Sequence, residues 1–182
     1  MLGVLGAFGL AAATGLNAYL PLLIVGLLAR YTDLIALKAP WNALTHPVVL
    51  IVIGALLLVE FTVDKIPAVD TLNDVIQTVF RPAAGAILFA ASGSVISNIS
   101  PILAMVCGLL IAGGVHTAKA VARPAVTAGT AGIGNPVVSL AEDAVSGVTT
   151  VVAVIAPVVL ALLFLLAVGL FIRWRERRKI RA

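Results

Sequence analysis

The chain has very little charge for its length of 182 residues. Only 11% of its residues are charged, 62% are hydrophobic, and the mean hydropathy is +1.17. A water-soluble fold of this size does not need so much apolar surface, so the composition excludes a soluble or secreted domain. One membrane crossing takes roughly 20 apolar residues, so the length allows five or six crossings. We expect an all-α, polytopic membrane helix bundle.

Cysteine and N-terminal charge are also scarce. Cys107 is the only cysteine and lies in an apolar stretch, which predicts packing and excludes a disulfide framework or a thiolate metal cluster. The first charged residue is Arg30, so the N-terminus lacks the basic start of a secretory signal peptide. The first apolar run is therefore expected to remain as a helix.

Positive charge is concentrated at the C-terminal end. The net charge is +4, and half of the twelve Lys and Arg residues follow the last apolar run. This placement indicates a cytoplasmic stop signal that contacts anionic membrane lipid, and it argues against nucleic acid as a partner. We expect residues 1–172 to form a single transmembrane domain and residues 173–182 a basic cytoplasmic tail. The basic tail residues are Arg173, Arg175, Arg177, Arg178, Lys179 and Arg181.

The first apolar run, residues 2–28, contains a proline beside a polar residue. Pro21 has no N–H to donate to the carbonyl of Asn17, four residues earlier, so we expect a helix kink at this point. The freed carbonyl and the Asn17 amide either bond to a neighbouring helix or line a substrate path.

The second span is expected to begin near Val48. The apolar residues that follow are too few to cross a bilayer, so the helix must continue through Glu60 toward Asp64. This places Glu60 within the membrane. The link that comes next is amphipathic, and Asp70 is expected to cap a helix over residues 71–80.

Three more crossings are expected in the second half of the chain. A weak span rich in small residues follows Pro82, a stronger one covers residues 102–121, and the last covers residues 148–172. The glycine-rich stretch 124–146 is a poor continuous helix and is expected to be broken or re-entrant. About five crossings place the N-terminus outside; a sixth, through the glycine-rich stretch, would move it inside.

Carboxylates gather in two short stretches, which contain six of the eight acidic residues. Carboxylates four residues apart share one helix face, and such a pair needs a proton or a cation between its members. We therefore expect all six to bind substrate or ion, together with Asn17 and Asn135. The first four, with their hard oxygen ligands, are candidates for a divalent cation, the only cofactor indicated. The six are Glu60, Asp64, Asp70, Asp74, Glu142 and Asp143.

Basic residues lie in the same two stretches. His116, Lys119 and Arg123 have helical spacing and form one stripe, which could neutralise the carboxylates or hold an anionic group. Lys65 is expected to act with them. The alternative is that charges at helix ends reach the interface and pair only for stability. That alternative explains Arg81 and Lys65 well, but not Glu60 and His116, which lie inside apolar runs.

Four segments of the sequence resemble a bacterial integral-membrane family, the domain of unknown function 4126. They are ATGLNAYLPLL near the start, E-x3-DKIPAVDTLND in the middle, H-x2-K-x3-RP later and GNPVVSLAED before the last run. The resemblance covers most of the chain and brings no assigned activity. It implies a multi-pass protein of the bacterial inner membrane, here with a cytoplasmic C-terminus.

Two further resemblances concern metal. Glu60, Asp64 and Lys65 are loosely similar to the E-x-G-D-K signature of manganese and calcium exchangers, although three residues separate the two carboxylates here. Asp70 and Asp74 resemble the metal-binding helices of phosphatidyl-transferring membrane enzymes, but the DG-x2-AR portion of that signature is absent.

The sequence thus predicts a small membrane transporter or channel-like carrier, with a proton or divalent metal ion as cargo. The alternatives are a transporter of an anionic solute or lipid headgroup, and a metal-dependent lipid-modifying enzyme. Five short helices offer little interior for six carboxylates, and the first run carries glycines suited to close helix contact. We therefore expect a homo-oligomer, most simply a dimer. The tripeptide Arg-Pro-Ala occurs twice, at residues 81–83 and 123–125, and this short repeat is a weak indication of two repeated halves.

Overall fold

The computed structural model describes residues 3–63, 67–92 and 100–180, and the regular structure in these ranges is entirely helical. This confirms the all-α prediction. The helices are α1 (Val4–Leu16), α2 (Tyr19–Tyr31), the short 3-10 helix η1 (Trp41–Thr45), α3 (Pro47–Val63), α4 (Pro67–Ala91), α5 (Pro101–Thr130), α6 (Asn135–Ile155) and α7 (Pro157–Ile180).

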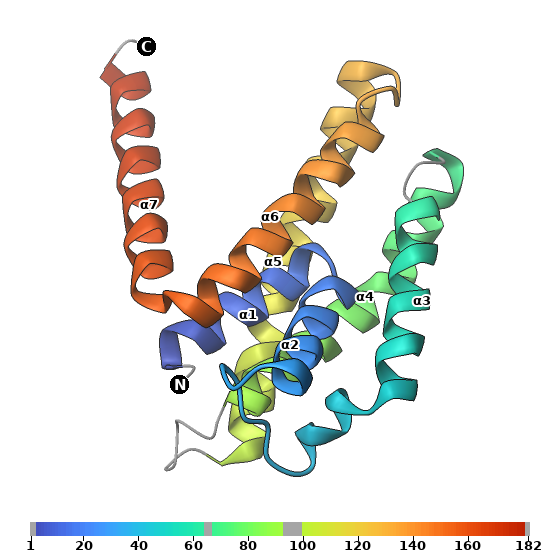
Figure 1. The fold of residues 1–182 in the computed structure, drawn as a ribbon. Helices are drawn as coiled ribbons and strands as arrows, with labels where there is room; N and C mark the ends of the chain where they lie inside the picture. The colour runs from blue at the N-terminus through green and yellow to red at the C-terminus, as the bar shows by residue number, and fades with distance from the viewer. Residues whose placement is uncertain (1–2, 64–66, 93–99, 181–182) are drawn as a thin grey trace.

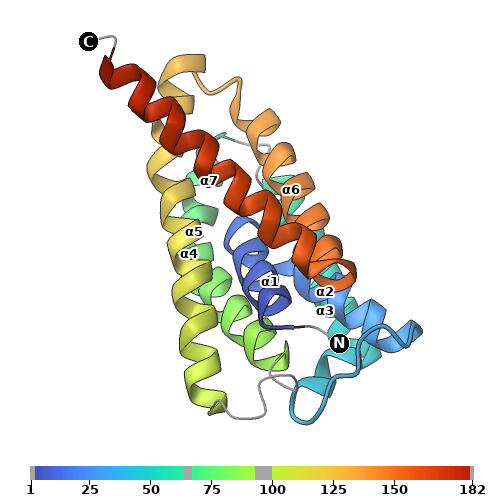
Figure 2. The same ribbon diagram turned by 90° about the vertical axis from the view of Figure 1, so that its left-hand side faces the viewer.

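An antiparallel pair of helices, α4 and α5, forms the spine of the bundle, and α1 packs against both (Figures 1 and 2). The pair meets at Gly85 and Gly108, where a side chain on Gly108 would run into the backbone of Gly85. At the α1 contact, a Cβ on Gly15 would lie 2.6 Å from the carbonyl oxygen of Ala112. Glycine is required at these points because the helix backbones touch.

The remaining helices surround this spine. After α5 the chain turns at residues 131–134, where Ala131 and Gly132 have positive φ angles of 50° and 84°. Helix α6 then returns along α1 and α2, and α3 packs against α2. Helix α7 diverges from α6, so that the two make a V in Figure 1.

The N-terminal half corrects three predictions. Residues 2–28 do not form one kinked helix; α1 and α2 are separate 13-residue helices, because Asn17 is extended at the junction. Helix α4 is one 25-residue helix that continues through Pro82, so the span expected after this proline is its second half. Asp70 is not an N-cap, since α4 begins at Pro67, a residue suited to a first helical position.

The C-terminal half corrects two more. Helix α5 continues through Pro124 to Thr130, so the glycine-rich stretch is broken only at residues 131–134. The last expected span, residues 148–172, is divided at Ala156 between α6 and α7. The residue before a proline avoids the helical conformation, and Pro157 follows directly.

Two helices, α5 with 30 residues and α6 with 21, are long and apolar enough to cross a membrane. The other apolar helical stretches in the described part of the chain, including Val75–Ala91 of α4 and Pro157–Arg173 of α7, have fewer residues than one crossing needs. About five crossings therefore stays a prediction.

Burial in this molecule differs from that of a typical soluble protein, because large charged side chains are buried beside an apolar core. The largest fully buried side chains include Arg81, Gln77 and Glu60, whereas Ile51 and Ile102 are 70% and 74% exposed. Large apolar side chains are exposed along α3, α5, α6 and α7. The polar interior, not an apolar core alone, is thus what these helices enclose.

Candidate functional site at a broken helix

The break between α1 and α2 is built around the Asn17 side chain. Its Oδ1 accepts hydrogen bonds from the backbone N–H groups of Tyr19 (3.0 Å) and Leu20 (2.8 Å), which caps the first turn of α2. Its Nδ2 donates to Asp143 Oδ1 at 2.8 Å. Asn17 is fully buried, and it ties the start of α2 to α6.

Side chains from two other helices bind the carbonyls at the end of α1. Lys119 Nζ donates to the carbonyl oxygen of Leu16 at 3.3 Å, and Ser146 Oγ donates to that of Ala13 at 2.9 Å. The last carbonyls of any helix lack partners within it, so the Lys119 bond satisfies a group that the break leaves open. The Ala13 carbonyl also accepts the backbone N–H of Asn17 at 3.2 Å, so the Ser146 bond is a second one to that oxygen. The break is therefore supported by α5 and α6.

One carboxylate oxygen beside the break binds two cationic side chains. Glu142 Oε2 lies 2.9 Å from Lys119 Nζ and 2.9 Å from Arg123 Nη2. Arg123 Nη2 also donates to Ser139 Oγ at 2.9 Å. Lys119 and Arg123 are both buried, so this group of charges is largely withdrawn from the surface. Charge-assisted hydrogen bonds of this kind are the strong ones in proteins.

A second polar group, an ion pair with a histidine bound to it, joins α3, α4 and α5. Arg81 Nη2 lies 3.1 Å from Glu60 Oε1, and the two side chains are 0% and 1% exposed. Arg81 Nη1 lies 3.0 Å from His116 Nδ1. On the far side of the ring, His116 Nε2 lies 3.1 Å from Thr78 Oγ1. His116 and Lys119 are one helical turn apart on α5, so the two groups of charges are neighbours.

The structure brings together five of the residues that the sequence marked: Asn17, Lys119, Arg123, Glu142 and Asp143. Glu60 and His116 belong to the adjoining group, in which both contact Arg81.

Asn135 stands apart from these charges. It accepts a hydrogen bond from Thr127 Oγ1 at 3.0 Å, next to the turn that joins α5 and α6.

Four of the residues that the sequence predicted for the site are not placed in it. Asp64 and Lys65 lie outside the described residues, and Asp70 and Asp74 lie in α4 with side chains that are also outside them. Among the described residues there is no group of three or more His, Cys, Asp or Glu side chains that could hold a metal ion. A divalent metal at Glu60, Asp64, Asp70 and Asp74 therefore stays a prediction.

Arg81 is the main residue that the sequence reasoning missed. Its position near the end of an amphipathic link suggested a charge that reaches the interface, but its side chain is fully buried. The Arg-Pro-Ala repeat was the available signal. Arg81 and Arg123 both lie inside a continuous helix, both precede a proline, and each binds a glutamate of a neighbouring helix.

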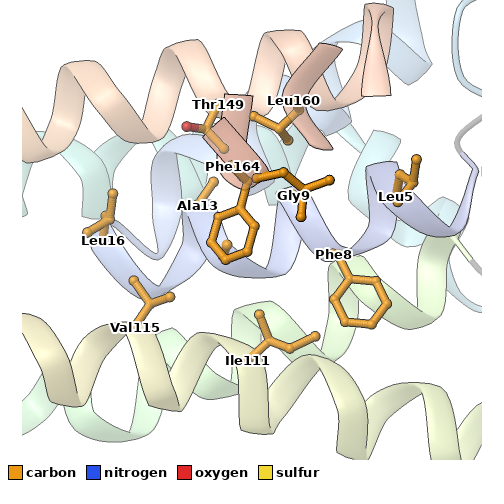
Figure 3. A pocket seen from close by; sticks show the side chains of 12 residues that line it. Leu5, Phe8, Gly9, Ala13, Leu16, Ile111, Val115, Thr149, Leu160 and Phe164 are labelled. Carbon is orange, nitrogen blue, oxygen red and sulfur yellow. The ribbon is translucent and has the colours of Figure 1, made fainter. Parts of the chain in front are cut away.

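An apolar cavity of about 720 Å³ adjoins the break. It lies between α1, α5, α6 and α7, and it includes Leu16, the residue whose carbonyl binds Lys119 (Figure 3). Its wall is formed mainly by aliphatic and aromatic side chains, with Thr149 as a polar exception. The cavity suits an apolar occupant and offers a charged solute little to bind.

These observations define an all-helical protein that encloses a network of buried charges at a broken helix. Residues 4–177 match the family described as "Domain of unknown function (DUF4126)", and the chain belongs to this family. The principal family resemblance is thereby confirmed. Comparisons with curated proteins and with solved structures found no match.

Proposed function

We propose that this chain is a small multi-pass carrier of the bacterial inner membrane, with a cytoplasmic C-terminus and its transport site at the break between α1 and α2. Large exposed apolar side chains around buried ionisable groups support a membrane environment, because apolar side chains can face lipid while buried ionisable groups mark transport paths. Helices α1 and α2 are each about 20 Å long, too short to cross alone, and the chain reverses direction between them, so the pair would enter and leave the membrane on one side (Figure 1).

The observation that carries the proposal is the broken helix itself. Within a membrane, non-helical backbone is tolerated where protein or a cavity surrounds it, and transporters commonly place their binding sites at such breaks. Here the C-terminal end of α1 and the N-terminal end of α2 meet at Asn17, beside Lys119, Glu142 and Asp143. The ends of two helices and three ionisable groups thus converge at one point.

A proton is the cation that this arrangement suits best. Glu60 and Glu142 already bind Arg and Lys side chains, so a divalent metal ion would have to displace those cations from buried positions. A proton instead changes the charge of one member without displacing another. Lys119 bonds both to Glu142 and to the Leu16 carbonyl, so a change in the network reaches the helix break directly.

An anionic solute or lipid headgroup is the second candidate, favoured by one feature. Lys119 and Arg123 point at the same oxygen of Glu142, which is how two cationic side chains would hold an oxygen of a bound anion. An anion that replaced the Glu142 carboxylate would be bound by the same two side chains without their rearrangement.

Proteoliposomes that contain a pH-sensitive dye test the proposal. An acid-outside gradient is applied with the membrane potential clamped, and Na⁺, K⁺, Mg²⁺, Mn²⁺ or phosphate is added outside in turn. Wild type should acidify the lumen with at least one of these ions, and Lys119→Met should not. Lys38→Met, at an exposed position, is the matched control and should behave as wild type. A wild type that acidifies the lumen under none of these conditions would refute the carrier.

We also propose a homodimer, because a bundle this small encloses little volume around its charges. Native mass spectrometry in mild detergent should show twice the chain mass. A folded, transport-active monomer would contradict it.

A further inference from the structure

The hydrogen bonds around His116 determine which ring nitrogen carries its hydrogen. A guanidinium group has only donors, so the Arg81 Nη1 that lies 3.0 Å from His116 Nδ1 must donate to it. Nδ1 therefore presents a lone pair. The ring hydrogen is on Nε2, which donates to Thr78 Oγ1 at 3.1 Å. In this arrangement the imidazole is neutral.

We infer that Nδ1 of His116 is the proton-binding atom of this protein, an assignment that rests on the proposed proton-linked carrier. The proton adds to the Nδ1 lone pair, and the hydrogen bond from Arg81 to that atom is lost. Nδ1–H and Nη1–H would then be two donors facing each other, each on a positively charged group, at a buried position. Arg81 must move away from the ring when the proton binds.

The neighbours of His116 determine where that movement is felt. Thr78 and Arg81 face it from α4, and Glu60 from α3 is bound to the same guanidinium. Lys119 lies one turn along α5 and contacts Glu142 of α6 and the last carbonyl of α1. Three further ionisable groups are adjacent. Arg123 on α5 also binds Glu142, and Asp143 on α6 binds Asn17. Tyr19 on α2 lies close to Glu60 and Arg81.

His116 therefore lies between the two groups of charges. A positive charge on its ring repels Arg81 on one side and Lys119 on the other. One protonation can thus alter both the Arg81–Glu60 pair and the contact of Lys119 with the helix break. A histidine that only packs in the interior would keep the same protonation state throughout transport.

The chain has two histidines, which makes the assignment measurable. The other, His46, is exposed, and His46→Gln leaves His116 as the single imidazole. In ¹⁵N-labelled His46→Gln protein in bilayers, nuclear magnetic resonance at neutral pH should show an unprotonated Nδ1 and a protonated Nε2. On acidification Nδ1 should gain a hydrogen over the pH range in which proton entry rises. A hydrogen on Nδ1 at neutral pH, or a ring that stays neutral across that range, would overturn the assignment.

Proton entry into the vesicles gives the second readout. Because a positioned proton-transfer group typically contributes a factor of 10² or more, His116→Gln should slow entry roughly 100-fold, and His46→Gln should match wild type. If His116→Gln fails to fold, Thr78→Val removes the hydroxyl that binds Nε2 and keeps the ring, and it should shift the pH dependence of entry. An unchanged pH dependence in Thr78→Val would count against the assignment.

Failure of the assignment can be told from failure of the carrier. If wild type and His116→Gln admit protons at equal rates, His116 is not the proton-binding residue and the carrier stands. If wild type admits none with any ion tested, the carrier fails, while the resonance measurement still decides the state of the ring.

Discussion

Two long apolar runs are each interrupted by a helix break, one at Asn17 between α1 and α2 and the other at Ala156 between α6 and α7. Different groups stabilise the two breaks. At Asn17, Lys119 of α5 and Ser146 of α6 bind carbonyls at the end of α1, and Asp143 of α6 binds the asparagine amide. At Ala156 the chain relies on its own backbone, since the carbonyl oxygen accepts from Val159 (3.0 Å) and Leu160 (3.3 Å).

The difference teaches what a helix break can be used for. At the second break Pro157 disfavours the helical conformation of Ala156, and α7 then runs away from the bundle (Figure 1). The first break also has a proline nearby, Pro21, but its geometry is fixed by a buried asparagine and by ionisable groups. A break supported by charges can respond to a change of charge, whereas one supported by backbone bonds only bends the chain.

The largest effect on stability should come from removing the cation of the buried Arg81–Glu60 ion pair. Arg81→Met leaves the Glu60 carboxylate, 1% exposed, without its cation, and we expect a loss of about 3–5 kcal/mol of unfolding free energy. Denaturant unfolding in detergent measures it. Arg81→Met with Glu60→Gln removes both charges and should recover most of the loss. An Arg81→Met protein as stable as wild type would contradict the buried pair.

The next effect concerns the asparagine at the first break. Asn17→Ala removes the cap of α2 and the bond to Asp143, and should lower the unfolding free energy by about 2 kcal/mol. Asn17→Ser keeps a capping oxygen and should recover about half of that, since Ser caps as well as Asn does. If Ala and Ser at this position were equally stable, the capping role would be wrong.

The sequence predicted much of the fold because hydrophobic runs and helix length are local properties. The all-α class and α3 through Glu60 followed from them. The prolines were harder to interpret. Pro82 and Pro124 continue their helices while Pro157 follows a break, and which outcome occurs depends on the packing of neighbouring helices.

The candidate site was predictable in its membership but not in its pairing. The helical spacing of Lys119 and Arg123 placed them on one face, which the structure confirms by joining both to Glu142. No local pattern shows that Glu60 binds Arg81, because 21 residues separate them and their contact depends on how α3 meets α4. Ser139 and Ser146 gave no signal, since a small polar residue in a helix is common without a role.

Two glycines of α1 offer a matched comparison of the two breaks. A Cβ on Gly15 meets the Ala112 carbonyl oxygen at 2.6 Å, and the α5 backbone cannot move away easily. A Cβ on Gly9 meets the end of the Leu160 side chain on α7, which can move, and the Cβ of Ala153 on α6 at 2.9 Å, which moves only with its backbone. Gly15→Ala should cost about 1–3 kcal/mol, and Gly9→Ala should cost less, because one of its two close contacts can move away. Equal losses in thermal unfolding would mean that the Leu160 side chain is held as firmly as the α5 backbone.

The smallest effect should come from Pro157→Ala. The proline occupies the first position of α7, so its loss mainly frees the unfolded chain, and stability should fall by less than about 1 kcal/mol. Melting temperature in detergent checks this. A loss as large as that of Asn17→Ala would show that the second break is not the passive one.

The central claim is that the break at Asn17, and not the break at Ala156, is where transport occurs. Lys119→Met leaves Glu142 with Arg123 and so keeps a paired carboxylate, which makes it comparable in folding to Pro157→Ala. Both variants, reconstituted at equal density in the dye-loaded vesicles, give the decisive comparison. The account predicts wild-type proton entry in Pro157→Ala and none above empty vesicles in Lys119→Met. Wild-type entry in Lys119→Met, or its loss in Pro157→Ala alone, would contradict it.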